Sequence, residues 1–475
     1  MTKSKVCVVG LGYIGLPTSA LLANRGYDVL GVDIAQDVVD TINQGKIHIV
    51  EPELDTFVCS AVESGRFIAD TKPDIADIFI IAVPTPFHEI MPSERSDSLK
   101  GTLVPKPNTD YVISATRSIA PYVREGNIVI LESTSPVGTT DKVEEVLKEE
   151  GVDTSRLHIA HCPERVLPGR IMCELIENDR IVGGITPEAT KITADFYREF
   201  VQGEVLETNA KTAEMTKLTE NSFRDVNIAF ANELSMLCDQ FCIDVLELIR
   251  LANRHPRVNI LQPGCGVGGH CIAVDPWFIV DAGKGSARLI ETARRVNDYK
   301  SEWVIEKVKN AISEWKLNRL RHCEEQTDAA IQSTRHFEQS DSHPELVSGS
   351  QKIREPKVAV MGLAFKPDID DLRESPALYI AKRLTSELEN VVCVEPNIPL
   401  DYFTNSKVSH SKQSTCHPEL DSGSKNTNQP QLVDLDSALN QSDIQVFLVA
   451  HKEFKMLSTI DYQPSTNLDF CGVLK

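Results

Sequence analysis

The sequence predicts an α/β fold in which two doubly wound, parallel-sheet domains are joined by a central domain of long helices. An apolar strand followed directly by a glycine turn occurs twice, at Lys5–Gly15 and at Glu355–Leu363, and such runs are typical of strands buried on both faces of a parallel sheet. Between them, Asn209–Phe241 carries apolar residues at helical spacing. A chain of 475 residues is also too long to fold around a single hydrophobic core, which indicates several domains. The expected domains are residues 1–203, 204–318 and 319–475.

The composition argues against several classes of function. The formal net charge of −20 disfavours nucleic acid as a partner. No uninterrupted apolar run reaches the ~18 residues of a membrane span, so no membrane association is expected. The 12 cysteines are scattered without paired spacing, which favours reduced thiols in the cytoplasm, and no residue spacing indicates a metal site.

The first domain begins with the pattern of a Rossmann-like dinucleotide site. A Gly-x-Gly-x-x-Gly turn follows the expected strand Lys5–Val9 and leads into a helix from Pro17 to Asn24. The next strand, Tyr27–Asp33, ends in an acid that suits a ribose hydroxyl, and an acid there favours NAD over NADP. The cofactor-binding residues expected here are Gly10, Gly12, Tyr13, Ile14, Gly15 and Asp33.

Two further strands end in loops that are candidate walls of the cofactor site. Ile78–Val83 is followed by Pro84-Thr85, and Ile128–Glu132 is followed by Ser133-Thr134. Ligands of open α/β sheets lie beyond the carboxyl ends of the strands. An ordinary turn rich in Pro and Ser explains each loop equally well.

A third loop, after the expected strand His158–His161, contains Glu164, Arg165 and Val166. Glu164 could serve as an acid–base group or a substrate contact. The alternative is an exposed loop carboxylate, which is the more frequent situation for any one Glu.

Polar residues recur at helical spacing along the central helix Asn209–Phe241. Glu214, Lys217, Asn221 and Arg224 share one face. The face is either solvated or turned inward, where a Lys–Asn pair would supply an amine and an amide at a reacting centre. Because long linking helices often bury apolar faces between subunits, a homodimer is expected.

The run from Gly264 to Pro276 has four glycines within six positions, then a Cys and, four residues later, an Asp. A thiol on such a loop can act as a nucleophile, which makes Cys271 the candidate. A buried, inert cysteine is the alternative. Zinc binding by Cys265, His270 and Cys271 is disfavoured because their spacing suits no common site.

Taken together, these motifs resemble the UDP-sugar 6-dehydrogenase family over most of the chain. The matching segments are Gly10 to Gly15, Pro84-Thr85-Pro86, Glu132-Ser133-Thr134, Pro163-Glu164-Arg165, Lys217 with Asn221, Gly268 to Pro276, Phe365 to Asp368, and Asp371 to Pro376. The resemblance implies a fold with a central domain like that of 6-phosphogluconate dehydrogenase.

The resemblance also implies a reaction. The C6 alcohol of a UDP-sugar is oxidised twice to a carboxylate, two NAD are reduced, and the product serves cell-envelope polysaccharide synthesis. Cys271 forms a thiohemiacetal and then a thioester, Lys217 and Asn221 stabilise the oxyanion, Asp275 assists water, and Glu164 is an active-site acid. The amino-acid sequence around Glu164 and Cys271 is most similar to that of family members that act on UDP-N-acetylmannosamine. UDP-N-acetylglucosamine and UDP-glucose are the alternative substrates. Pro168 stands where UDP-glucose enzymes carry a second acid.

By the same resemblance the third domain holds the UDP group. Lys366 and Arg373 match the family's candidates, although without the motif they would be an exposed basic pair, and Arg257 matches an arginine that reaches the substrate across the dimer interface. The implied substrate-binding residues are Glu164, Arg165, Val166, Lys217, Asn221, Arg257, Gly268, Lys366 and Arg373.

The third domain is interrupted by two segments that fit no element. Residues 322–352 and 408–429 are polar and aperiodic, and His343–Ser350 nearly repeats as His417–Ser424. We expect two largely disordered surface inserts of common origin. The remaining strands are expected at Val391–Glu395 and Ile444–Val449.

Two competing functions remain open at this point. A relative that oxidises only once, like the β-hydroxyacid and 6-phosphogluconate dehydrogenases, shares the architecture but needs no cysteine. A non-catalytic UDP-sugar-binding protein damaged by its inserts is the second alternative. Intact candidates at Lys217, Asn221, Cys271 and Asp275 argue against such decay.

Overall fold

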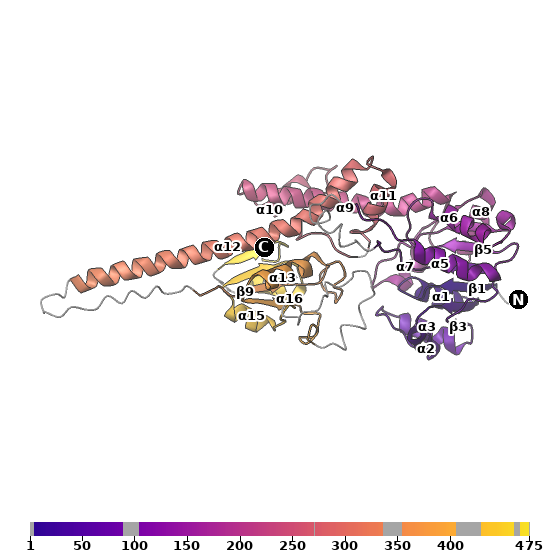
Figure 1. Ribbon diagram of the computed structural model, residues 1–475, viewed down its shortest axis with the longest axis horizontal. Helices are drawn as coiled ribbons and strands as arrows, with labels where there is room; N and C mark the ends of the chain where they lie inside the picture. The colour runs from indigo at the N-terminus through magenta and orange to yellow at the C-terminus, as the bar shows by residue number, and fades with distance from the viewer. Residues whose placement is uncertain are drawn as a thin grey trace. The chain divides into compact units, whose positions relative to one another are not determined.

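The computed structural model describes residues 4–88, 104–269, 271–335, 354–404, 429–459 and 466–474. The chain divides into two compact units, each of which contains one sheet (Figure 1). Unit 1 comprises Met1–Phe223 with Asp275–Glu291, and unit 2 comprises Arg224–Val274 with Thr292–Lys475.

Unit 1 is built on an eight-stranded sheet with the order β3-β2-β1-β4-β5-β6-β7-β8. The strands are β1 Lys5–Val9, β2 Asp28–Val32, β3 Phe67–Asp70, β4 Ile78–Ile81, β5 Ile128–Leu131, β6 His158–His161, β7 Arg180–Gly184 and β8 Val205–Asn209. Neighbouring strands are parallel except for β6 and β7. The strand order reverses between β1 and β4, as in a doubly wound fold.

Helices cover both faces of this sheet because its strands are apolar on both sides. Val6 and Val8 of β1 belong to one core cluster, whereas Cys7 and Val9 belong to the other, as the two-residue period of a strand requires. The first cluster is completed by α1 Gly15–Asn24, α2 Gln36–Asn43, α3 Leu54–Glu63, α7 Ile171–Glu177 and α8 Pro187–Arg198, and the second by α5 Asp110–Ile119 and α6 Thr139–Glu149. Short 3₁₀ turns lie at η1 Ala120–Tyr122 and η2 Thr154–Arg156.

The predicted central helix agrees closely with the structure. The helix expected over Asn209–Phe241 is α9, Ala210–Gln240, and α10 and α11 span Val245–Ala252 and Asp275–Gly283. The helix α12 begins at Arg288 and continues to Arg335, into the first expected insert. The expectation of irregular structure is therefore wrong for residues 322–335, where Glu, Gln and Ala are good helix formers.

Unit 2 contains a four-stranded parallel sheet with the order β10-β9-β11-β12. The elements are β9 Val358–Met361, α13 Pro376–Glu387, β10 Val391–Val394, α15 Leu435–Gln441, β11 Ile444–Phe447, α16 Lys452–Lys455, η3 Met456–Thr459 and β12 Asn467–Asp469. One core cluster joins the sheet to α12 and α13, and another joins it to α15 and α16. The predicted second Rossmann-like sheet is thus present.

Some predictions concern residues that the structure does not describe. Residues 336–352 of the first expected insert and 408–428 of the second lie outside the described ranges. Among the described helices, none combines the length and apolarity required to cross a bilayer.

Candidate active site

Three glycines shape the turn between β1 and α1. Gly10 has φ of +95°, and a Cβ there would lie 2.6 Å from the carbonyl oxygen of Ala82. A Cβ at Gly15 would lie only 1.8 Å from the carbonyl oxygen of Gly10. At Gly12, by contrast, a Cβ would meet nothing within 4 Å. The protein's own packing does not demand glycine at position 12, which suits a backbone that a phosphate group approaches closely.

The Asp33 carboxylate, at the end of β2, is directed to this turn by backbone donors. Its Oδ2 accepts the N–H of Leu11 at 3.0 Å and its Oδ1 accepts the N–H of Ala35 at 3.0 Å. Tyr13 is 38% exposed and Ile14 precedes the first residue of α1. The half-buried acid beside a glycine turn has the arrangement that holds the ribose of a dinucleotide.

The loops after β4 and β5 are tied to each other. Thr85 Oγ1 donates to the carbonyl oxygen of Thr134 at 2.5 Å, and Ser133 Oγ donates to the carbonyl oxygen of Val83 at 2.7 Å. The loop with Pro84 and Thr85 follows β4, which lies beside β1 where the strand order reverses, and the other loop follows β5, the next strand of the sheet. Ligands bind at this point of open α/β sheets, so the turn, Asp33 and the two loops together fit NAD.

Glu214 has a structural role that its place in the polar stripe of α9 did not reveal. The residue is 1% exposed, and its carboxylate accepts the N–H of Gly138 at 2.6 Å and the N–H of Thr140 at 2.7 Å. These donors belong to the first turn of α6, whose positive end favours an anion. Glu214 therefore fixes the loop that carries Ser133 and Thr134.

The loop after β6 buries Glu164 rather than exposing it. The residue is 6% exposed, its Oε1 accepts the N–H of Arg165 at 2.6 Å, and its Oε2 pairs with Arg180. The Arg165 guanidinium binds Glu220 of α9 at 2.7 Å, and Val166 packs on the core. Both carboxylate oxygens of Glu164 are thus engaged by the protein itself, and sequence spacing gave no signal for Arg180.

Asn221 and Asp275 form a hydrogen-bonded pair at 2.5 Å, with Asn221 Nδ2 as the donor and Asp275 Oδ2 as the acceptor. Asp275 is 3% exposed at the start of α11. Burial raises its pKa to about 7, opposed by the Asn221 hydrogen bond and the positive charge of Lys217. An ammonium, an amide and a carboxyl group that titrates near neutrality can stabilise an oxyanion and move a proton.

The two cysteines of the glycine-rich loop have opposite environments. Cys271 is exposed, whereas Cys265 is 4% exposed within the core of unit 2. Burial raises the pKa of the Cys265 thiol to about 12. Since the nucleophilic form is a reachable thiolate, Cys271 is the better candidate nucleophile of these two cysteines. His270 lies outside the described residues.

The glycine-rich loop packs closely against the segment between β9 and α13. A Cβ on Gly268 would lie 2.4 Å from the carbonyl oxygen of Glu374, and one on Gly269 would lie 2.9 Å from the Phe365 ring. At the other end of the loop, the N–H of Gly264 donates to the buried Asn232 side chain at 2.9 Å. The backbone leading to Cys271 is therefore fixed on both sides.

The three basic residues expected to bind substrate differ in their surroundings. Lys366 and Arg257 are exposed. Arg373 is half-buried, and its guanidinium binds Asp371 with an Nη2–Oδ2 distance of 2.6 Å. Lys366 and Arg373 both belong to the segment that contacts Gly268 and Gly269, so nucleotide-binding candidates and the cysteine loop adjoin each other within unit 2.

One group of possible metal ligands occurs among the described residues. Ligand atoms of Asp368, His451 and Glu453 lie within 4.8 Å of one another. Both nitrogens of His451 already take part in protein hydrogen bonds, with Asp368, Asn397 and Glu395.

Comparison with known families matches three consecutive parts of the chain. Residues 4–201, 211–299 and 359–475 match the NAD binding, central and UDP binding domains of the UDP-glucose/GDP-mannose dehydrogenase family. The predicted NAD cofactor and the predicted class of enzyme are thereby confirmed.

Individual relatives match over nearly their whole length. A UDP-N-acetyl-D-mannosamine dehydrogenase from Campylobacter jejuni is 49% identical and covers 98% of this chain and 99% of its own. An NDP-N-acetyl-D-galactosaminuronic acid dehydrogenase from Ralstonia nicotianae is 45% identical, with 98% and 96% covered. A solved structure of the UDP-N-acetyl-mannosamine dehydrogenase Cap5O from S. aureus has a TM-score of 0.76 at 37% identity and covers 99% and 96%. The fold, the site motifs and these matches place the chain in the UDP-glucose/GDP-mannose dehydrogenase family.

Proposed function

We propose that this enzyme oxidises the C6 alcohol of UDP-N-acetyl-D-mannosamine twice, giving UDP-N-acetyl-D-mannosaminuronate. The observation that carries the proposal is the exposed Cys271 on a loop packed against the UDP-binding segment, in a family of NAD-dependent dehydrogenases. Two oxidations at one carbon need a carrier that retains the aldehyde, and a thiolate can serve.

The reaction balances with one water. The alcohol loses a proton and a hydride to become an aldehyde, and the Cys271 thiolate adds to its carbonyl carbon to form a thiohemiacetal. Loss of the second hydride gives a thioester, which water cleaves to the carboxylate and the thiol. Bound NAD supplies the hydride acceptor in both oxidations. One alcohol, one water and two NAD⁺ thus yield one carboxylate, two NADH and three protons.

We assign the supporting roles from charge and hydrogen bonding. Lys217 and Asn221 stabilise the developing oxyanion, because an ammonium and an amide N–H favour negative oxygen. Asp275, whose pKa is raised to about 7 by burial, accepts a proton from the hydrolytic water. Glu164 and Arg165 shape the substrate site from the loop after β6, and Lys366 with Arg373 binds the diphosphate.

The sugar is assigned from the relatives. Those named UDP-N-acetyl-D-mannosamine dehydrogenase include the Campylobacter jejuni protein and one from Escherichia coli strain K12 that is 47% identical. The Ralstonia relative at 45% supports an N-acetylgalactosamine sugar as the second candidate. The exposed Pro168 provides no carboxylate on the loop after β6, where the UDP-glucose enzymes carry an acid.

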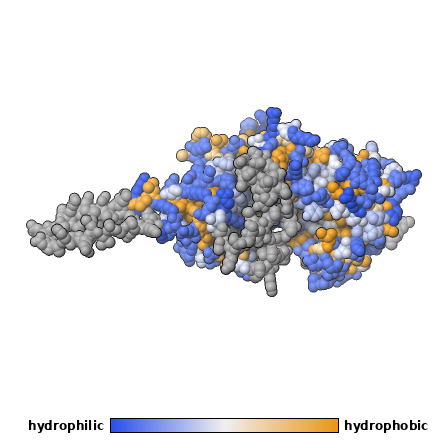
Figure 2. All heavy atoms as spheres, in the orientation of Figure 1, coloured by the Kyte–Doolittle hydropathy of each residue, from blue (hydrophilic) through white to orange (hydrophobic). Residues whose placement is uncertain are grey.

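We further propose that the enzyme is a homodimer that works in the cytoplasm. Large apolar side chains are exposed along α9, namely Phe223 at 68%, Phe230 at 52% and Leu237 at 42%, and Phe241, just beyond its end, is 67% exposed. Apolar atoms are visible at the surface over the end of α9 and α10 (Figure 2). A second α9 would cover such a stripe, and a reducing compartment would keep Cys271 nucleophilic.

The decisive experiment measures NADH formed per sugar consumed. Purified enzyme is given limiting UDP-N-acetylmannosamine with excess NAD, and parallel reactions contain the N-acetylglucosamine, N-acetylgalactosamine and glucose analogues. Two NADH per UDP-N-acetylmannosamine, with the highest kcat/KM for that sugar, are expected. A ratio of one would indicate the relative that oxidises once, a preference for another sugar would reassign the substrate, and UDP binding without turnover would revive the non-catalytic alternative.

A further inference from the structure

The segment between β9 and α13 has a backbone that its own residues do not favour. Asp368 has φ of +61° and Glu374 has φ of +50°, a left-handed conformation that residues other than glycine rarely adopt. Lys366 and Arg373 lie on the same segment. Such a backbone persists when contacts from elsewhere in the fold hold it.

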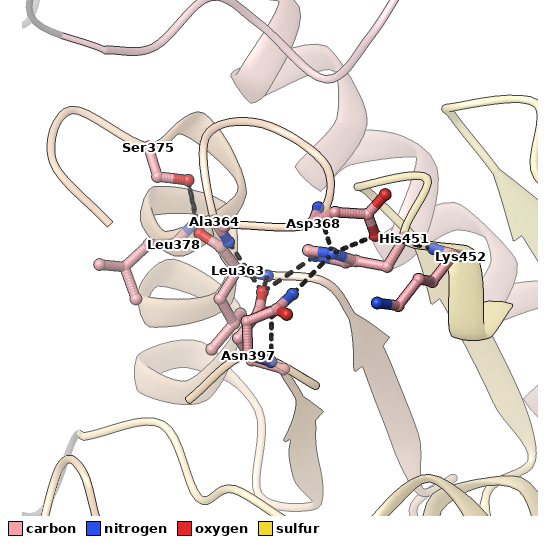
Figure 3. A network of polar contacts seen from close by, with 9 residues as sticks. Leu363, Ala364, Asp368, Ser375, Leu378, Asn397, His451 and Lys452 are labelled. Atoms are coloured by element: carbon pink, nitrogen blue, oxygen red, sulfur yellow. Dashed lines mark hydrogen bonds and ion pairs between the residues drawn. The ribbon is translucent and has the colours of Figure 1, made fainter. Parts of the chain in front are cut away.

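His451, the residue immediately before α16, supplies one such contact. Its Nδ1 accepts the N–H of Asp368 at 3.0 Å and lies 3.1 Å from Asn397 Nδ2 (Figure 3). Because the Asp368 amide can only donate, Nδ1 carries the lone pair and the ring proton belongs on Nε2. In return, Asp368 Oδ1 accepts the N–H of Lys452 at 3.0 Å. The two backbone segments therefore hold each other.

Glu395 fixes the other side of the imidazole. Its Oε2 lies 3.2 Å from His451 Nε2 and also accepts the N–H of Leu363 at 2.7 Å and the N–H of Ala364 at 2.9 Å. His451 is 0% exposed and Glu395 is 4% exposed. The pair thus links the start of the segment, at Leu363, to the strained position at Asp368.

In the sheet of unit 2, Glu395 occupies the position that Asp33, the candidate ribose-binding acid, occupies in the sheet of unit 1. Gly362 follows β9 with φ of +92°, as Gly10 follows β1 with φ of +95°. Asp33 and Glu395 each follow the neighbouring strand and accept an N–H from the residue after that glycine. Asp33 remains half-buried, whereas Glu395 is buried with its acceptors engaged by the protein. Glu395 is therefore placed to anchor the chain rather than to meet a ligand.

The same segment extends to the cysteine loop. The carbonyl of Glu374 and the ring of Phe365 occupy the space where a Cβ of Gly268 or Gly269 would be. A change in the segment would therefore disturb the backbone that precedes Cys271. Through this segment, the contacts of His451 affect both the candidate diphosphate ligands and the cysteine loop within unit 2.

We propose that His451, oriented by Glu395, is a positioning residue that holds residues 363–375 in the conformation that binds the UDP group. The inference rests on the proposed function, in which Lys366 and Arg373 bind the diphosphate. His451 does not touch the nucleotide in this proposal. It preorganises the segment, and preorganisation increases affinity by reducing the ordering that binding requires.

Two substitutions test the acceptor role of Nδ1 and the donor role of Nε2 separately. In His451→Asn, Oδ1 can replace Nδ1 as the acceptor for Asp368, whereas in His451→Gln, Nε2 can replace the donor to Glu395 but the acceptor is lost. Isothermal titration of the full-length protein with UDP should give about a tenfold weaker Kd for His451→Gln, because a buried N–H is left unpaired. His451→Asn should stay within about twofold of wild type.

Steady-state kinetics provide a second readout. His451→Gln should raise KM for the UDP-sugar by about tenfold and lower kcat by a smaller factor, because the segment also packs against the loop that leads to Cys271, while KM for NAD stays within about twofold. The matched control is Val446→Ala in β11, which is 0% exposed in the core of unit 2. This substitution should lower the melting temperature without weakening the binding of UDP, since it leaves the contacts of His451 intact.

The outcomes distinguish the two proposals. Wild-type affinity for UDP in a folded His451→Gln, or an equal loss in Val446→Ala or in His451→Asn, would overturn the positioning role while leaving the proposed function intact. If wild-type protein fails to bind UDP, the proposed function fails and the positioning role fails with it. If Lys366→Ala and Arg373→Ala both bind UDP normally, the diphosphate site assigned to this segment fails, and the positioning role fails while the proposed oxidation stands.

Discussion

At the scale of single residues, burial distinguishes the two thiols of the glycine-rich loop. Cys265 packs among apolar residues and its pKa is raised to about 12 by that burial, whereas Cys271 is exposed. Cys271→Ser should reduce NAD reduction by about 10³-fold or more, as removal of a covalent nucleophile does. Cys265→Ala, assayed with the same sugar at the same pH, should stay within about threefold of wild type.

Retained turnover in Cys271→Ser would exclude the covalent mechanism. With one NADH formed per sugar, it would also favour a single oxidation. Loss of activity in Cys265→Ala without loss of fold would indicate that the roles of the two thiols have been exchanged.

Asp275 makes a pH-dependent prediction, because burial raises its pKa from 3.8 to about 7. A proton-accepting carboxylate must be ionised, so kcat/KM should rise with pH and level off above pH ~7. Asp275→Asn should lower kcat by about 10²–10⁴-fold. A pH profile that is flat from pH 5 to 8 in the wild type would contradict this role.

The raised pKa of Asp275 also predicts how the folding stability of the wild type and of Asp275→Asn changes with pH. With a folded-state pKa raised to about 7, the folded enzyme binds more protons than the unfolded chain between pH ~4 and ~7, so stability falls as pH rises through this window. Asp275→Asn removes the dependence. Its melting temperature, relative to wild type, should therefore be more favourable at pH 8 than at pH 4.5.

At the scale of elements, the predicted strands and helices agree with the structure where local periodicity determines them. β1 and α9 lie within a residue or so of their expected positions, because apolar spacing indicates directly which face of an element is buried. The extension of α12 to Arg335 was not foreseen, because the polar segment lacks an apolar stripe and was judged by composition.

The glycine-rich loop allows a matched pair of substitutions. A Cβ at Gly268 would lie 2.4 Å from the Glu374 carbonyl oxygen, whereas one at Gly264 would lie 3.8 Å from its nearest neighbour. Gly268→Ala should therefore displace the loop and lower kcat/KM by about tenfold or more, while Gly264→Ala should remain close to wild type. Melting temperatures measured on both variants separate local displacement from loss of fold, and equal activity in the two would contradict the close packing.

At the scale of the whole molecule, sequence motifs predict candidate site residues better than they predict the contacts that hold those residues in place. Gly12, Asp33 and Cys271 lie in short motifs with a known purpose. Their supports join residues far apart in the chain, as when Glu214 caps α6 from α9 and when Arg180 meets Glu164. No local pattern signals such pairs, since the spacing of the partners is set only by the folded sheet.

The proposed dimer gives the prediction at this scale. Phe223, Phe230 and Leu237 recur every seven residues on one side of α9 and are 68%, 52% and 42% exposed, and so large an apolar stripe favours association with a second copy. Phe230→Asp would place a charge in that interface, so sedimentation equilibrium should show monomers at concentrations where the wild type is dimeric. Ile75→Asp, at an apolar residue of unit 1 that is 54% exposed, is the control and should leave the mass unchanged.

If Arg257 acts across the interface, kcat/KM of Phe230→Asp should recover with rising protein concentration in parallel with dimer mass. A wild-type enzyme that sediments as a monomer while fully active would refute both the interface and the shared arginine.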